Sequence, residues 1–189
     1  MRSRLLLAAV AAALATAPAA SADDASLTAV LTTHHERLLA AEKAVAKQLD
    51  RDAPARATGP AARRVVGALG DYAATVRSIA AAVRREEGST DDGRRARSLF
   101  LRSVRHDLIA TGYLRRSFGR LAELPRGAGK KARRRAVAKA FTGLMVGVVL
   151  MPRAERLRER GLGLLGIEYD SPILDVIEED DATAFGPGR

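Results

Sequence analysis

The chain has 189 residues, with 32 basic and 22 acidic side chains and a formal net charge of +10 at pH 7. It contains no cysteine and no tryptophan, with three tyrosines and four phenylalanines. The lack of thiols excludes disulfide-stapled folds and thiolate metal sites, and the scarcity of rings disfavours a surface that stacks bases or sugars. With 47% apolar residues, the composition is that of a globular protein.

The first 22 residues have the layout of a secretory signal peptide. Arg2 and Arg4 precede an uncharged apolar run, which begins at Leu5 and is too short to span a bilayer. Small residues follow and end at Ala22, a typical cleavage position. We therefore expect a mature chain that begins at Asp23, is secreted or associated with the cell envelope, and has no transmembrane segment. An amino-terminal membrane anchor is the weaker alternative.

Four segments carry apolar residues at spacings of three and four, which is the period of an amphipathic helix. They predict helices over about 26–50, 59–87, 94–124 and from 125 or 130 to 160. No segment has the alternation of a strand. Long helices joined by short turns favour antiparallel neighbours. We therefore predict an all-α, elongated up-down four-helix bundle over residues 23–165, followed by an acidic, partly disordered tail over 166–189 that packs back on the bundle.

The third predicted helix has a second apolar stripe beside its main one, formed by Leu99, His106, Ile109 and Tyr113. Two apolar faces indicate that this helix is covered on both sides. The second cover could be another helix, the tail or a protein partner. On the main stripe of the same helix lies Arg115, which we expect to extend its charged end to solvent or to pair with an acid such as Glu36 or Asp71.

The fourth predicted helix contains twelve uncharged residues, from 140 to 151. This length indicates a helix surrounded by the other three rather than a membrane span. Pro152 follows and is expected to kink or interrupt the helix, because proline removes one backbone hydrogen bond. The residues after it are expected to form a charged turn or two.

Positive charge is concentrated at the start of the fourth helix. Six cations fall within ten residues there, with no acid among them: Arg126, Lys130, Lys131, Arg133, Arg134 and Arg135. This cluster predicts a docking surface for a polyanion, such as anionic lipid, an anionic wall polymer or extracellular nucleic acid. The chain has no sequence motif for specific nucleic-acid recognition. The alternative is a solvated helix end, or a surface masked by the tail, which has seven acidic residues and one basic residue over 161–189.

Few side chains point to catalysis or to a cofactor. His34 and His106 lie on apolar stripes of two different helices, and Asp107 follows His106. If those helices face each other, the three side chains could hold Zn²⁺ or Cu²⁺, or a histidine could ligate haem. The alternative is one histidine that is hydrogen-bonded across a helix seam, with the other two exposed. The chain has no nucleophile motif and no phosphate loop. We therefore predict a non-enzymatic binding protein without a cofactor, and a small metal- or haem-binding bundle as the alternative.

Overall fold

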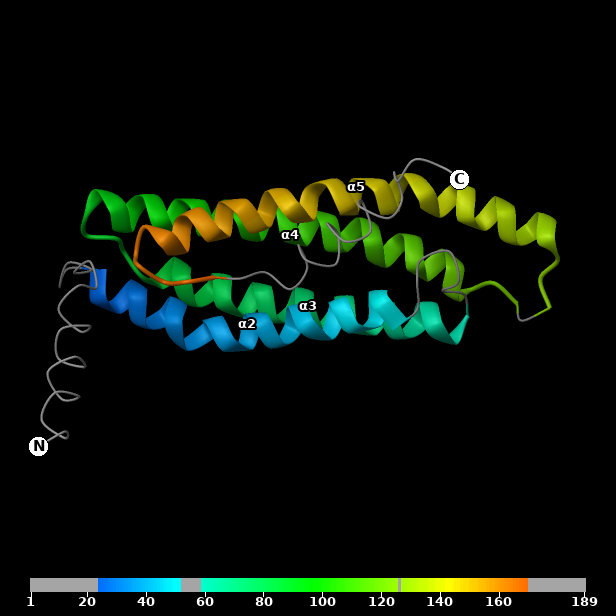
Figure 1. The fold of residues 1–189 in the computed structure, drawn as a ribbon, viewed down its shortest axis with the longest axis horizontal. Coiled ribbons are helices and arrows are strands. Elements are labelled where there is room, and N and C mark those ends of the chain that lie inside the picture. Colours follow the sequence, from blue (N-terminus) through cyan, green and yellow to red (C-terminus); the bar gives the residue numbers. More distant parts are fainter. Residues whose placement is uncertain (1–23, 52–58, 126, 170–189) are drawn as a thin grey trace, which may run out of the picture.

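The computed structural model describes residues 24–51, 59–125 and 127–169, and these form four long helices with no strand among them. The helices are α2 (Ala25–Arg51), α3 (Pro60–Arg85), α4 (Asp91–Ala122) and α5 (Lys130–Gly163). Successive helices run in opposite directions, so the molecule is an elongated up-down bundle (Figure 1). The predicted all-α four-helix fold is confirmed, and each helix begins and ends within a few residues of its predicted bounds.

Backbone and side-chain caps fix the ends of α3 and α4. Gly59 has a φ of +59°, a conformation that glycine adopts without steric cost, and Pro60 then occupies the first position of α3. At the start of α4, the Thr90 hydroxyl accepts a hydrogen bond from the Gly93 amide at 3.0 Å. The turn before α4 is also tied to the start of α2, because the Ser89 amide donates to the Asp24 carboxylate at 2.7 Å.

Asp24 is almost fully buried in this contact and also accepts a short hydrogen bond from the Thr90 hydroxyl. That hydrogen bond lowers the pKa of Asp24, with further help from the Ser89 and Thr90 amides against the opposing effect of burial. A side chain at Gly93 would collide with the Asp24 carboxylate, so glycine is required there. Asp24 therefore joins the start of α2 to the turn before α4 at one end of the bundle.

Apolar stripes from α2, α3 and α4 supply most of the core. Each stripe repeats at the helical period, as in Leu27, Leu31 and Leu38 of α2, all of which are buried. In α4 the buried stripe includes Phe100, Val104, Leu114 and Phe118. The core has no cysteine, so within the described residues it is held by packing and by polar contacts alone.

Helix α5 packs closely against α4 over much of its length. A Cβ atom placed on Gly147 would lie 2.5 Å from the Leu114 side chain, and one on Gly161 would lie 3.0 Å from the Ala96 carbonyl oxygen and 3.2 Å from the Leu99 Cβ. These glycines let the two helices approach more closely than larger residues would allow. Helix α5 thus covers the Leu99 end of the second α4 stripe, one of the three covers that the sequence left open.

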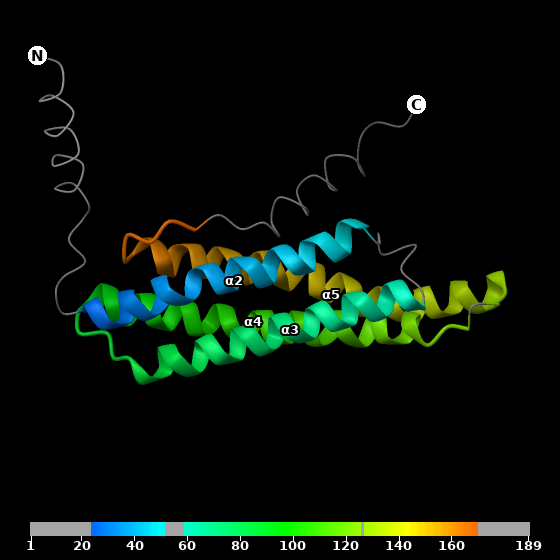
Figure 2. The same cartoon turned by 90° about the horizontal axis from the view of Figure 1, so that it is seen from below.

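One expectation about the environment of α5 is wrong. Its uncharged middle is not surrounded by the other helices, because several of its large apolar side chains are exposed. The part of α5 that precedes this middle extends past the ends of α2 and α3 (Figures 1 and 2). Phe141 is 57% exposed and Val149 is 50% exposed. Of the two effects predicted for Pro152, a kink or an interruption, the interruption does not occur, because the helix is continuous from Lys130 to Gly163. Proline cannot donate the backbone hydrogen bond of its position, and Pro152 is only partly buried, so water can reach this side of the helix.

Arg115 is not buried, and of the two outcomes expected for it, a side chain that reaches solvent or an ion pair, the structure shows the first. Arg115 is exposed and lies across Gly70 of α3, with its guanidinium 3.7 Å from the position that a Cβ atom would take on that glycine. The long arginine side chain reaches solvent along the helix surface instead of entering the core.

After α5 the chain turns back on the bundle. Gly166 has a φ of +69°, and the Ile167 amide donates to the Leu162 carbonyl at 3.1 Å, the pattern of a Schellman helix ending. Leu165 is buried and Tyr169 packs against the core. The beginning of the tail therefore packs on the bundle as predicted. The rest of the predicted tail contact, the disorder from residue 180 and the signal peptide all fall on residues outside the described ranges.

Candidate functional site

A group of charged side chains is buried between the four helices. Arg158 of α5 is at its centre and forms ion pairs with Glu42 of α2, Asp107 of α4 and Glu155 of its own helix. All four of these residues are 0% exposed. The guanidinium of Arg158 also donates to the hydroxyl of Tyr72 on α3 at 3.3 Å. One arginine therefore contacts a side chain from each of the other three helices.

Tyr169, from the segment after α5, completes this cluster. Arg158 donates to its hydroxyl oxygen at 2.6 Å. The same hydroxyl lies 2.9 Å from Glu42 Oε1 and forms a short hydrogen bond with Glu155. The ring of Tyr169 meets the His35 ring edge-on, with centroids 5.7 Å apart. Burial lowers the pKa of His35, so a neutral imidazole is favoured beside Tyr169. We call Arg158, Glu42, Asp107, Glu155, Tyr72 and Tyr169 the buried cluster.

The buried cluster has three carboxyl groups and one guanidinium, so it cannot be neutral with every carboxyl group ionised. Burial raises the pKa of Glu42 to about 8 and that of Asp107 to about 7, although the nearby Arg158 opposes both shifts. A proton held on one of these groups reduces the excess negative charge. The three carboxyl groups and Arg158 are closed to solvent and Tyr169 is partly buried, so the cluster joins the helices from within.

The predicted metal ligands do not form a site together. Asp107 is engaged by Arg158, whereas His34 and His106 are partly buried on their separate helices. Within the part of the chain that the structure describes, no group of three or more histidine, aspartate or glutamate side chains is placed to hold a metal ion. The positions of the described histidines therefore give no support to a metal or haem site.

The predicted basic cluster lies at an accessible end of the molecule. Lys130, Lys131, Arg133, Arg134 and Arg135 are all exposed in the first turns of α5, and Arg126 lies outside the described residues. We call these five residues the basic end. Across the described ranges, no carboxylate forms an ion pair with any of them.

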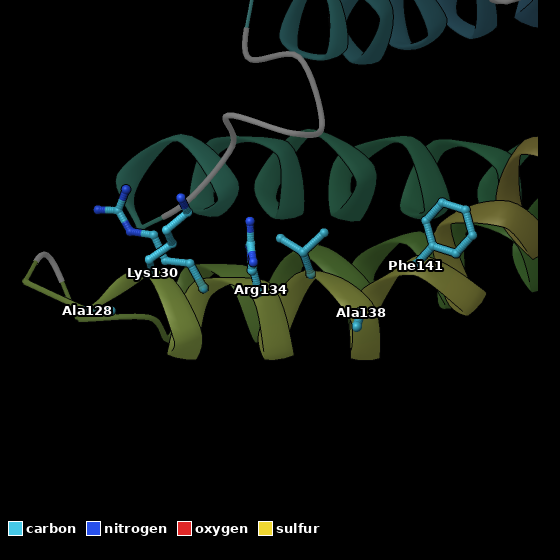
Figure 3. Close-up of a pocket in the computed structure, with 7 residues that line it drawn as sticks. Ala128, Lys130, Arg134, Ala138 and Phe141 are labelled. Carbon is cyan, nitrogen blue, oxygen red and sulfur yellow. The ribbon is translucent and has the colours of Figure 1, made fainter.

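A shallow groove of about 650 Å³ runs along this part of α5. Lys130 and Arg134 line it together with Phe141, and these three side chains project to the same side of the helix (Figure 3). Val137 and Ala138 fill the interval between the charged and aromatic residues. Cationic and apolar side chains thus follow each other along one helix face.

The apolar part of that face continues beyond the groove. Four large apolar side chains are exposed there, which we call the apolar patch: Phe141 (57%), Met145 (46%), Val148 (42%) and Val149 (50%). Their spacing of four, three and one residues keeps them on one side of a helix that turns about 100° per residue. Gly143 and Gly147 face α4 from the opposite side. The apolar patch therefore points away from α4.

Length and composition alone would allow α5 to cross a membrane, and among the described helices only α5 meets that test. Only 17% of its most apolar 18-residue window is buried in the bundle. The core helix of a soluble protein would have most of this window buried. The unusual feature of α5 is thus that an apolar segment is largely uncovered.

The predicted partner face of α4 is only partly free. Its Leu99 end lies against α5 and His106 is partly buried, whereas Ile109 is 41% and Tyr113 is 37% exposed. The guanidinium of Arg116 lies 4.7 Å from the centre of the Tyr113 ring, a cation–π contact that covers part of it. This face is therefore less open than the apolar patch of α5.

No protein-family model, curated protein or solved structure gives a significant match to this chain.

Proposed function

We propose that this protein is a non-enzymatic binding protein of the cell envelope, which docks on an anionic surface through the basic end of α5. The observation that carries the proposal is the position of the five cations. They are exposed at a protruding helix end, and no described carboxylate is paired with them.

Local helix stability gives no reason for cations at this place. The amino-terminal end of a helix carries a partial positive charge, so acidic residues stabilise it and basic residues oppose it. The first turn of α5 contains no acidic residue and begins with Lys130 and Lys131. Positive charge at this end thus costs stability in the isolated protein, and an anionic ligand would remove that cost.

The field of the basic end also suits attraction to an extended anionic surface. Like charges grouped within about two helical turns raise the local potential, and the attraction to a surface falls with increasing salt because mobile ions screen it. The net charge of +10 over the whole chain acts in the same direction at longer range. The layout requires no specific pocket, in agreement with the shallow shape of the groove.

The test is the triple charge reversal Arg133→Glu, Arg134→Glu and Arg135→Glu, measured by the salt concentration at which the protein elutes from immobilised heparin. We expect the variant to elute at clearly lower salt than the parent protein. The reversal should not unfold the helix, because acidic residues are favourable in its first turns.

The matched control is Arg77→Glu, Arg102→Glu and Arg105→Glu, which makes the same change in net charge at exposed positions on α3 and α4. If the control lowers the elution salt as much as the α5 variant does, binding depends on net charge alone and the proposed site is wrong.

A further inference from the structure

The apolar patch is not explained by attraction to charge alone. A wall polymer or a nucleic acid would be bound by cations and hydrogen-bond donors. Such a polar ligand would not bury the apolar side chains on the same face, which are Phe141, Met145, Val148 and Val149. Exposed apolar side chains in such a group are unfavourable in water and commonly mark a contact surface. The ligand should therefore combine negative charge with an apolar phase.

We propose that α5 lies flat on an anionic lipid bilayer, with the apolar patch inserted among the upper acyl chains and the basic end bound to the headgroups. This inference rests on the proposed function and names its ligand. A bilayer presents anionic headgroups and an apolar layer a few ångströms below them at every point of its surface.

The order of residues along α5 fits that arrangement. Lys130 and Arg134 come first on the outward side, the small residue Ala138 follows, and the apolar patch comes next. From Lys130 to Val149 the face is roughly 30 Å long at 1.5 Å per residue. Stable attachment of a peripheral protein usually needs two signals, and here a cationic signal and an apolar signal lie on one helix.

Among the described residues, the apolar patch remains exposed to solvent. Gly143 and Gly147 place α4 behind α5, on the side away from the apolar patch. The amino-terminal part of α5 also extends past the neighbouring ends of α2 and α3 in both views (Figures 1 and 2). The basic end and the apolar patch are thus both accessible in the part of the chain that the structure describes.

The experiment measures binding to vesicles of phosphatidylglycerol, and to vesicles of phosphatidylcholine as the uncharged comparison. The test variant is Phe141→Gln with Met145→Gln, and its matched control is Ile109→Gln with Tyr113→Gln, which removes two exposed apolar side chains from α4. Glutamine is a good helix former, so the helices should be retained, as the circular dichroism spectrum and melting temperature will check.

We expect the parent protein to bind phosphatidylglycerol vesicles and to bind phosphatidylcholine vesicles far more weakly. The α5 variant should lose about tenfold or more in vesicle partitioning, because burial of a phenylalanine and a methionine side chain is worth at least that factor. Its elution from heparin should not change, and the α4 control should bind vesicles like the parent protein.

Several results would overturn the inference while leaving the proposed function in place. One is vesicle binding by the α5 variant at the level of the parent protein, which would make the attachment purely electrostatic. Another is heparin binding by a parent protein that does not bind vesicles. A third is a stable dimer of the parent protein that the α5 variant converts to a monomer, since a second copy would then cover the patch. Failure to bind either heparin or vesicles would overturn the proposed function as well.

Discussion

Arg158 is surrounded by more negative charge than it can neutralise. It faces the carboxyl groups of Glu42, Asp107 and Glu155, all closed to solvent, and the Tyr72 hydroxyl. Breaking a buried ion pair by removal of one partner is costly, because the remaining charge has no counterion. The cluster therefore fixes how the four helices register against one another, and its protonation state should influence stability.

The pH dependence of stability follows from Glu42, whose pKa rises from 4.5 to about 8 because it is buried. The folded state holds a proton on this group that the unfolded state releases above about pH 4.5. Its contribution to stability is thus fully present below pH 4.5 and is lost as the pH rises through about 8. We expect the melting temperature of the parent protein to fall between pH 6 and pH 9.

The variant Glu42→Gln separates this effect from other titrating groups. Glutamine keeps polar contacts to Arg158 and Tyr169 but does not titrate, so the fall in melting temperature over the same pH range should be smaller. His35 acts with the opposite sign, because its pKa is lowered, and it is unchanged in the variant. Identical pH profiles for the two proteins would show that Glu42 is already ionised in the fold at neutral pH.

The sequence contains a signal for the buried cluster that helical periodicity does not reveal. Glu42 falls between Leu38 and Val45, at the spacing of the α2 stripe, and Arg158 falls at the same spacing after Ala154 on α5. The sequence predicts a charged turn or two after Pro152, but it does not indicate that Glu155 and Arg158 are buried there. Only the mutual approach of several helices shows that these charges compensate one another, and a single sequence does not contain that information.

At the scale of the helices, sequence periodicity predicts their number, order and bounds. It does not predict which side of each helix the others cover. The spacing of apolar residues predicts which segments are helical. It does not say that Gly143, Gly147 and Gly161 would lie against α4, or that the opposite side of α5 would stay open. The uncharged middle of α5 has apolar residues on all sides, so its pattern could not separate the covered side from the exposed one.

The glycine contacts between α4 and α5 lead to a prediction about stability. Gly161→Ala should destabilise the protein by about 1–3 kcal/mol, because the new methyl group would be crowded by the Ala96 carbonyl and the Leu99 side chain, and overpacking has a cost of that size. Gly67→Ala is the control. No atom lies within 4 Å of the position that its new methyl group would take, so the variant should gain up to about 1 kcal/mol from helix propensity.

Chemical denaturation with urea measures both changes. A Gly161→Ala variant that gains as much stability as Gly67→Ala would mean that the two helices can separate slightly without cost, so that close approach at this point is not required.

For the whole molecule, the structure separates the two halves of α5. Arg158 anchors the carboxy-terminal half in the buried cluster, and the basic end lies about 40 Å away along the helix axis at 1.5 Å per residue. The half that holds the fold together is thus distinct from the half that we assign to binding. Substitutions in the apolar patch should therefore change attachment to lipid with little effect on the melting temperature.

The chain contains no tryptophan, so one introduced tryptophan can report directly on whether the apolar patch of α5 enters the bilayer. Phe141→Trp places a single fluorescent reporter in the apolar patch, and Ala74→Trp places one at an exposed position on α3. On phosphatidylglycerol vesicles, we predict that the emission of Phe141→Trp shifts to shorter wavelength and is quenched by lipids brominated on their acyl chains, while Ala74→Trp changes in neither respect. Unshifted and unquenched emission from Phe141→Trp in vesicle-bound protein would contradict insertion of α5 into the bilayer.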